Sequence, residues 1–179
     1  TGQRPGEVSS MQWNHIEDDW WTIPGETRKN QETNRVPIMP MFKEVLEQAK
    51  AFSSESEYVF RSTMHEDATD KTPKPITRAS MAAAILRHRQ EMSIIEPFTP
   101  HDLRRTMRTR LAQIGISDII AERLLGHKLQ GLLAVYNRYT YDMEKRQAMA
   151  AWERKLNEIL GLSESKQANV IPFMRGRNG

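Results

Sequence analysis

The chain has 179 residues, enough for one domain with at most a short tail. Hydrophobic residues make up 38%, which allows a real core, and no apolar run approaches the about 18 residues of a membrane span. The polar N-terminus gives no sign of a signal peptide. The absence of cysteine excludes disulfides, thiolate catalysis and Cys-based zinc sites, and is compatible with a cytosolic setting. A net charge of +3 and a pI near 9.3 are consistent with a polyanionic partner.

The first half of the sequence predicts a small sheet and two helices. Residues 1–12 form a turn and a short helix, with Pro5 at the first helical position. Two strands are expected at 20–24 and 34–39, joined by the polar stretch 25–33, and a third at 57–60. Residues 39–52 have helical apolar spacing, and 61–75 form a loop with two prolines.

The second half predicts a series of capped helices. Thr77 caps a helix over 78–90. Thr99 at the N-cap, Pro100 and Asp102 begin another, which ends at Gly115.

In that helix Leu103, Met107 and Leu111 recur every fourth residue, which predicts a buried stripe. Ser117 then caps a helix that ends at Gly126.

A short helix follows at 131–139. A longer helix over 142–161 is expected to place Met149, Trp152, Leu156 and Ile159 on its inner face. The expected fold class is therefore α+β, mainly α-helical, with a three-stranded antiparallel sheet near the N-terminus.

Positive charge gathers at the start of the helix after Thr99. His101 lies three residues before Arg104 and four before Arg105, so either arginine can share its helix face. A helix N-terminus favours anions, which makes a phosphate site credible; a solvated basic face is the alternative.

Other candidates are unremarkable one by one. His127 follows a helix end, and Tyr136 stands nine residues later. Arg4 and Lys29 are ordinary turn residues when taken alone. Together these side chains supply positive groups, proton carriers and a nucleophile, which is what phosphoryl transfer without a metal requires.

Five motifs, in order, resemble the tyrosine recombinases, and most of all the phage-type integrases. They are "TGQRPGE", a hairpin lysine in "ETRKNQETNRVPI", "HDLRRT", "LLGHK", and a tyrosine nine residues after that histidine. The resemblance covers residues 1–160 and implies the catalytic-domain fold of that family, with 161–179 as a C-terminal tail that could dock on a neighbouring subunit.

The resemblance implies a role for each matched residue. Arg4 and Arg104 would clamp the scissile phosphate with His101 and His127, Lys29 would be the general acid, Tyr136 the nucleophile, and Glu7 would support the site from behind. It selects Arg104 over Arg105. Arg28 competes with Lys29, and Tyr139 and Tyr141 compete with Tyr136.

The implied activity is site-specific cleavage and rejoining of double-stranded DNA through a 3′-phosphotyrosyl bond, with no cofactor or metal. Backbone contacts are expected from Arg87, Arg89, Arg108 and Arg110. The resemblance also implies a homotetramer on DNA, accessory DNA-bending proteins, and a place in the bacterial cytoplasm at the nucleoid. Because the chain starts inside the first motif, we expect a fragment that is monomeric, binds DNA weakly and does not recombine alone.

Three alternatives remain. A type IB topoisomerase or a telomere resolvase would share this chemistry. A non-catalytic regulator would use residues 99–128 as a helix-turn-helix, but leaves Arg4, Lys29 and Tyr136 unexplained. A metallohydrolase is least favoured, since the five histidines lack paired ligand spacing.

Overall fold

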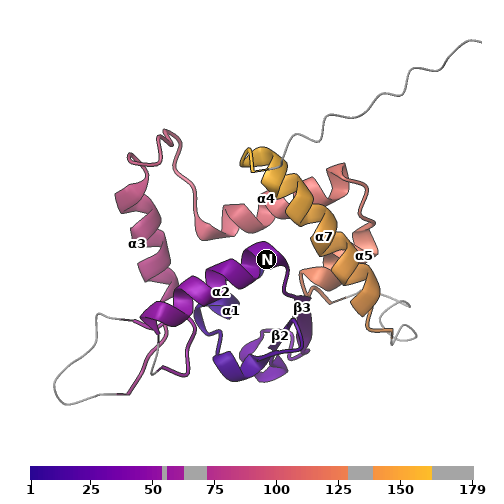
Figure 1. Ribbon diagram of the computed structural model, residues 1–179, viewed down its shortest axis with the longest axis horizontal. Helices are drawn as coiled ribbons and strands as arrows, with labels where there is room; N and C mark the ends of the chain where they lie inside the picture. Colours follow the sequence, from indigo (N-terminus) through magenta and orange to yellow (C-terminus); the bar gives the residue numbers. More distant parts are fainter. Residues whose placement is uncertain (54–55, 63–71, 129–138, 163–179) are drawn as a thin grey trace, which may run out of the picture.

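The computed structural model describes residues 1–53, 56–62, 72–128 and 139–162 (Figure 1). Apart from the place of the third strand, its helices and strands follow the order expected from the sequence. The α-helices are α1 (Pro5–Ser9), α2 (Pro40–Phe52), α3 (Arg78–His88), α4 (Pro100–Gln113), α5 (Asp118–Leu124) and α7 (Asp142–Ile159). Short 3-10 turns occupy Trp13–His15 and Gly25–Thr27.

The sheet has three antiparallel strands in the order β1 (Ile16–Glu17), β2 (Trp20–Ile23) and β3 (Asn34–Pro37). Trp21 pairs with Val36, so both side chains lie on the buried face. The expectation of a three-stranded antiparallel sheet is confirmed, with two of its strands where the sequence placed them.

The third strand was expected in the wrong place. Residues 57–60 are not part of the sheet: Tyr58 makes an isolated bridge with Gln12, and Val59 is buried in the core. The run is apolar because it packs under the sheet, and only one residue pair has ladder geometry. The third strand is Ile16–Glu17 instead.

The helices begin where the sequence predicts. The Thr77 hydroxyl accepts a hydrogen bond from the Ser80 N–H at 3.0 Å and caps α3. At α4 the Asp102 carboxylate accepts from the Thr99 N–H at 3.0 Å, which satisfies a donor that the helix leaves open.

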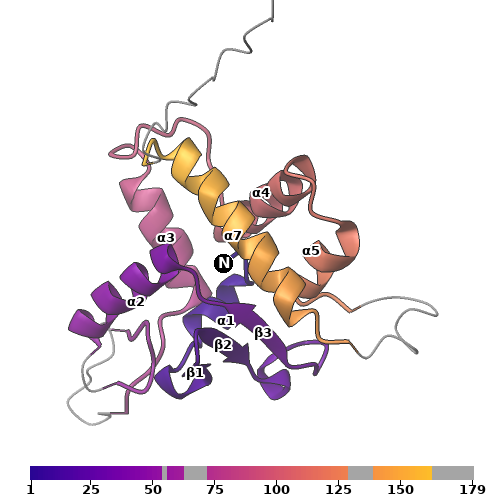
Figure 2. The same cartoon turned by 45° about the vertical axis from the view of Figure 1, so that its right-hand side comes forward.

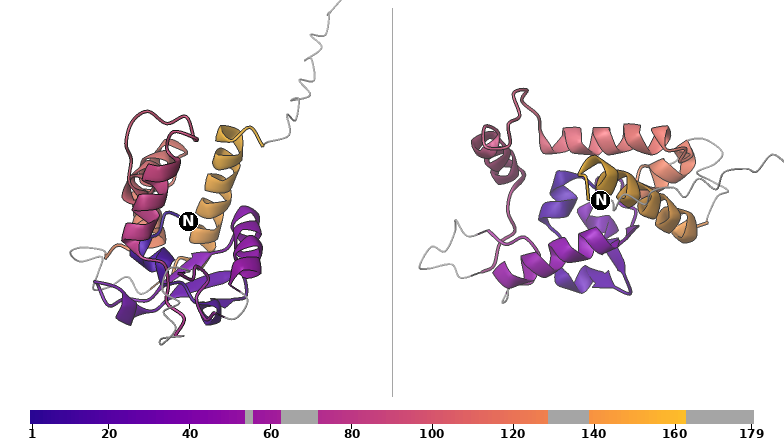
Figure 3. Two further views of the ribbon diagram at one scale, coloured as in Figure 1. Left: turned by 90° about the vertical axis from the view of Figure 1, so that its left-hand side faces the viewer. Right: turned by 45° about the horizontal axis from the view of Figure 1, so that its top comes forward.

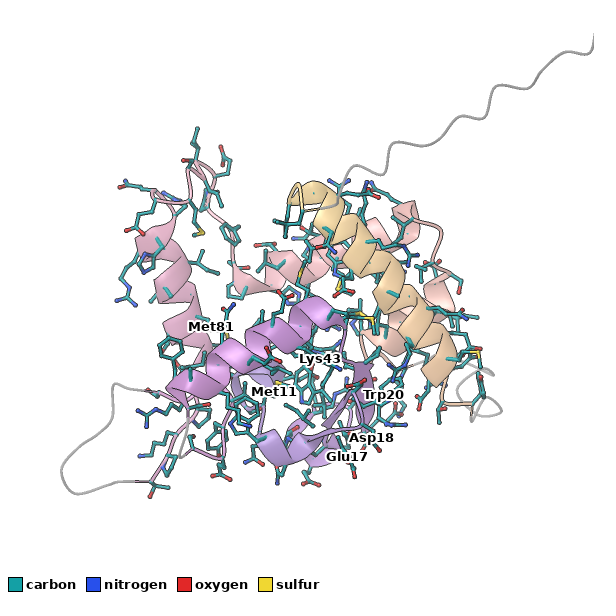
Figure 4. The ribbon with its side chains drawn as sticks, in the orientation of Figure 1. Met11, Glu17, Asp18, Trp20, Lys43 and Met81 are labelled. Atoms are coloured by element: carbon teal, nitrogen blue, oxygen red, sulfur yellow. The ribbon has the colours of Figure 1, made fainter. Side chains whose placement is uncertain are left out.

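Two hydrophobic clusters divide the molecule. One joins the sheet to α2 and contains Met11, Trp21, Val36 and Leu46; Figure 4 labels Met11 beside α2. The other joins α4, α5 and α7. Its buried members are Met39, Met107, Leu111, Ala121, Leu124, Ala148 and Met149.

The arrangement of the helices brings the start and end of the described chain together. α3 lies beside the beginning of α4 and α5 beside its end (Figures 1 and 3). α7 contacts α4, α5 and β3 (Figure 2). Thr1, marked N, lies in the middle of the molecule in these views. The first residues of the chain therefore lie between the two hydrophobic clusters.

The buried stripe of α4 differs from the prediction. Met107 and Leu111 are buried as expected, but Leu103 is 57% exposed and Arg104 is only 4% exposed. The helix is rotated so that the face with Arg104 turns inward, because that side chain finds carbonyl partners there. On α7, Met149 is buried but Ile159 is 53% exposed, since the last turn extends past the core.

The predicted helix at 131–139 lies almost wholly outside the described residues, as does the tail from 163. Within the described part of the chain, no helix has the length and apolar character needed to cross a membrane.

Candidate active site

The site is built around a buried carboxylate, Glu7, in the first turn of α1. Glu7 accepts the backbone N–H of Arg4 at 2.9 Å and the Arg4 guanidinium at 2.9 Å. Pro5 favours the helix start, so the N-cap position is fixed at Arg4. The backbone of Arg4 is thus held by Glu7, while its side chain stays half-exposed.

Arg28 approaches the same carboxylate from the turn between β2 and β3. Its Nε donates to Glu7 at 2.9 Å, and its two Nη groups donate to the carbonyls of Glu32 and Gly126, each at 2.6 Å. The side chain is fully enclosed. Arg28 therefore holds the turn, α1 and the end of α5 together, while its neighbour Lys29 is exposed.

Gly126 is required at this junction for two reasons. Its φ of +66° is a conformation that favours glycine, and a Cβ there would lie 2.0 Å from Arg28 Nη2. Glycine thus allows the backbone to turn after α5 and leaves space for the Arg28 guanidinium.

Arg104 is the second buried arginine. Its Nη1 donates to the Gly2 carbonyl at 2.8 Å and its Nη2 to the Leu125 carbonyl at 2.9 Å. The same Nη2 lies 2.7 Å from Nε2 of His127. One side chain on α4 thereby connects the first residues of the chain with the segment that follows α5.

His127 is fixed on both sides of its ring. Nδ1 contacts the carboxylate of Glu122 on α5, and Nε2 faces Arg104. Its backbone N–H donates to the Glu122 carbonyl at 2.8 Å. Glu122 escaped the sequence interpretation, although its place five residues before His127, on the last turns of a helix, was a usable signal.

Positive charge exceeds negative charge in this cluster. Burial raises the pKa of the Glu7 carboxyl, but hydrogen bonds from Arg28 and Arg4 outweigh it and hold the pKa below its ordinary value. Burial, followed by the charge of Arg4, lowers the pKa of Arg104 to about 10. Arg104 stays charged at neutral pH, and it lies close enough to Arg4 to be destabilised by it.

A cavity of about 340 Å³ adjoins His127 between β3, α5 and the start of α7. Lys145 lines it and is only 6% exposed; its ammonium donates to the Arg35 carbonyl at 3.1 Å. Burial lowers the pKa of Lys145 to about 8. The sequence interpretation gave this lysine no role.

Trp20 on β2 lies between two arginines near this cavity. The guanidinium groups of Arg35 and Arg146 lie 4.6 and 4.9 Å from its ring centre, on β3 and α7 respectively. Figure 4 labels Trp20 at this boundary. These contacts attach α7 to the sheet next to the cavity.

Three predicted residues are not joined to the cluster by any described contact. His101 and Lys29 are exposed, and neither side chain makes a hydrogen bond to another residue in the described part of the chain. Tyr136 lies outside the described residues. Its competitors Tyr139 and Tyr141 pack edge to face, with ring centres 4.8 Å apart.

The four arginines expected on the DNA backbone differ in their surroundings. Arg87 is exposed at the end of α3 and Arg89 is half-buried just beyond it. Arg110 is exposed and donates to Gln113 at 3.0 Å. Arg108 forms ion pairs through Nε with Glu122 at 2.8 Å and through Nη2 with Asp118 at 2.7 Å, so these two donors already have partners.

No group of three or more His, Asp or Glu side chains suited to a metal ion occurs among the residues that the structure describes. The side chains of Arg4, Arg104 and His127 offer donors and positive charge, an arrangement suited to holding an anion such as a phosphate.

The chain is similar to known proteins over most of its length. A family model described as "Phage integrase family" matches residues 1–143. The integrase of Escherichia phage HK022 is 31% identical over 144 residues, which cover 76% of this chain and 38% of that protein. This chain thus spans well under half of that relative's length.

Two solved structures share the fold. The lambda integrase catalytic core is 26% identical, with a TM-score of 0.52 over 70% of this chain and 76% of that one. A lambda integrase tetramer bound to a Holliday junction is 24% identical, with a TM-score of 0.54 over 79% of this chain and 40% of that one.

Proposed function

Because this chain belongs to the phage integrase family of tyrosine recombinases, we propose that it is the catalytic part of a site-specific DNA recombinase. Residues 1–160 would form the catalytic domain, and 161–179 a tail that docks on a neighbouring subunit. The activity of the whole protein is a proposal, since the chain matches only 38% of the HK022 integrase.

One observation carries the proposal: the contact between Arg104 and His127 at 2.7 Å, beside the half-exposed Arg4. Two guanidinium groups that destabilise each other gain from an anion placed between them. Planar guanidinium groups can each bind two oxygens of a phosphate. The scissile phosphate of DNA would take this place.

Four groups would hold that phosphate. Arg4 and Arg104 would bind its non-bridging oxygens and stabilise the charge that grows there in the transition state. His127 would donate to it from Nε2. His101, one helical turn before Arg104 at the N-terminus of α4, would contact it from the exposed side.

The chemistry would use Tyr136 and Lys29. The phenol of Tyr136 would lose its proton and attack phosphorus; the bond to the 5′ oxygen would break, and Lys29 would protonate that oxygen. The DNA would be left with a 3′-phosphotyrosyl bond and a free 5′ hydroxyl. Attack by a 5′ hydroxyl would reverse the step and reseal a strand, with no net change in bond type.

The burial of Arg28 favours Lys29 as the acid. The three nitrogens of the Arg28 guanidinium donate to Glu7 and to two backbone carbonyls. Lys29, in the same turn, is exposed. The general acid must reach the leaving oxygen, which requires an accessible side chain.

The partner would be double-stranded DNA, with Arg87, Arg89 and Arg110 contacting its backbone. The lambda integrase tetramer on a Holliday junction is the kind of assembly we propose for the whole protein, with accessory DNA-bending proteins. Its place would be on DNA in the bacterial cytoplasm, as a phage or prophage protein.

Covalent capture tests the proposal. The protein, expressed from its complete reading frame, is offered nicked duplexes of randomised sequence, in which cleavage releases a short strand and traps the adduct. We expect a protein–DNA adduct that Tyr136→Phe abolishes and that Tyr139→Phe and Tyr141→Phe retain. Failure of the unmodified protein to form any adduct, or an adduct that survives Tyr136→Phe, would contradict the proposal.

A further inference from the structure

His127 lies between two groups of opposite charge. The Glu122 carboxylate contacts Nδ1, and Arg104 Nη2 lies 2.7 Å from Nε2. A guanidinium can only donate hydrogen bonds, so Nε2 must present its lone pair. The ring hydrogen is therefore on Nδ1, where it is donated to Glu122.

Glu122 is itself held in place. Its Oε1 accepts from Arg108 Nε at 2.8 Å, and Arg108 Nη2 donates to Asp118 at 2.7 Å. Burial raises the pKa of the Glu122 carboxyl, but hydrogen bonds from Arg108 and His127 outweigh it and keep the pKa below its ordinary value. At neutral pH the group is a fixed hydrogen-bond acceptor.

We propose that Glu122, held by Arg108, is a positioning residue that directs Nε2 of His127 toward Arg104 and the phosphate. The part that concerns the phosphate rests on the proposed function. In order to donate to the phosphate, Nε2 must give up the hydrogen bond from Arg104 and take up a proton from solvent, and the Glu122 carboxylate then stabilises the imidazolium at Nδ1. Arg108 thus acts on the site through two side chains, Glu122 and His127.

The inference makes Glu122→Gln informative. Arg108 offers only donors, so the amide oxygen of the substituted side chain would accept from it and the amide NH₂ would face Nδ1. Nδ1 would then have to accept, which moves the ring hydrogen to Nε2, opposite the donors of Arg104. A substitution that barely changes side-chain volume should therefore reverse the tautomer.

The tautomer can be measured without DNA, from the ¹⁵N chemical shifts of the His127 ring at a pH where the ring is neutral. We expect Nδ1–H in the unmodified chain and a shift toward Nε2–H in Glu122→Gln. Adding Arg108→Ala to that variant frees the new amide oxygen to accept from Nδ1–H, and should restore the first tautomer. Glu158→Gln removes a carboxylate from the exposed Lys155 pair on α7 and should leave the ring unchanged.

The same variants then enter single-turnover cleavage at saturating DNA, on a sequence recovered by covalent capture. Glu122→Gln should slow cleavage about 10–100-fold, as expected when a carboxylate that orients a functional histidine is lost, with DNA affinity within about twofold. Glu158→Gln should cleave at the unmodified rate.

The outcomes separate the two proposals. An Nε2–H ring in the unmodified chain, or the same tautomer in Glu122→Gln, overturns the inference whatever the enzyme does. A reversed tautomer with full cleavage rate overturns the positioning role. Absence of any adduct with the unmodified protein overturns the proposed function, and the NMR result still decides whether Glu122 sets the tautomer.

Discussion

The guanidinium of Arg28 donates a hydrogen bond to the carbonyl of Gly126, 98 residues later in the chain, at 2.6 Å. This contact ties the turn that carries Lys29 to the segment that carries His127. Both ends of it are buried, and Glu7 balances the charge from beneath. The proposed acid, Lys29, and the proposed phosphate ligand, His127, are thereby each next to a residue of the same buried contact.

Removal of Arg28 should therefore act mainly on stability. Arg28→Ala removes three hydrogen bonds from a buried charged group, to Glu7 and to the carbonyls of Glu32 and Gly126, and leaves Glu7 with Arg4 alone. The free energy of unfolding should therefore fall by about 3–5 kcal/mol. Urea denaturation followed by circular dichroism measures this. Lys29→Ala is the matched control: its stability should stay within about 0.5 kcal/mol of the unmodified chain, while its cleavage of DNA falls. A stable, active Arg28→Ala protein would disprove the assignment.

Gly126→Ala should disturb the same junction. The φ of +66° costs an alanine about 1–2 kcal/mol, and its Cβ would meet Arg28 Nη2 at 2.0 Å. We expect a total loss of more than about 2 kcal/mol, since the backbone cost and the steric contact add. Gly115→Ala has a φ of +83° and open space around its Cβ, so it should show the backbone cost alone. Equal losses in the two variants would mean that the contact with Arg28 contributes nothing.

The rotation of α4 predicts unequal effects of two leucines. Leu111 is fully buried, and Leu111→Ala should cost about 2–5 kcal/mol. Leu103 is 57% exposed, so Leu103→Ser should lower the free energy of unfolding by less than about 0.5 kcal/mol. Thermal or urea unfolding of both variants tests the orientation of the helix, and similarly large losses in both would restore the stripe expected from the sequence.

Lys145 predicts a rise of stability with pH. Its folded pKa of about 8 lies below the ordinary value of about 10.4, so between these pH values the unfolded chain binds a proton that the folded chain does not. The free energy of unfolding then gains a positive slope with pH in this window. Urea titrations between about pH 7 and about pH 10 measure it. Lys145→Met should remove this contribution, and Lys155→Met, on the exposed side of α7, should keep it.

Much of the fold could be predicted because local signals were strong. Thr77 and the Thr99–Asp102 pair mark helix starts by hydrogen bonds between near neighbours, and strand β2 is a clear run of aromatic and β-branched residues. The third strand could not be found in this way. It is only two residues long, and its pairing with β2 depends on the tight turn between them.

The candidate site was predictable in residue type but not in environment. Sequence reasoning places leucine inside, so it chose Leu103 for the core, and it assigned Arg104 to the phosphate without predicting that this side chain would be buried. The actual choice depends on backbone carbonyls of Gly2 and Leu125, which come from elsewhere in the chain. Arg28 and Lys29 could not be separated for the same reason, since the partners of Arg28 lie far away in sequence.

Arg104 contacts Gly2, Leu125 and His127, so it stabilises the fold as well as being a proposed phosphate ligand. Substitutions of Arg104 that are found in a screen for lost recombination should therefore mostly give insoluble or degraded protein. Their loss of activity would then reflect a folding defect and not the loss of a catalytic group. A stable, inactive form of the protein, suited to trapping a DNA complex for crystallography, is better sought at the exposed Lys29, whose side chain has no described contact with the residues around Arg104.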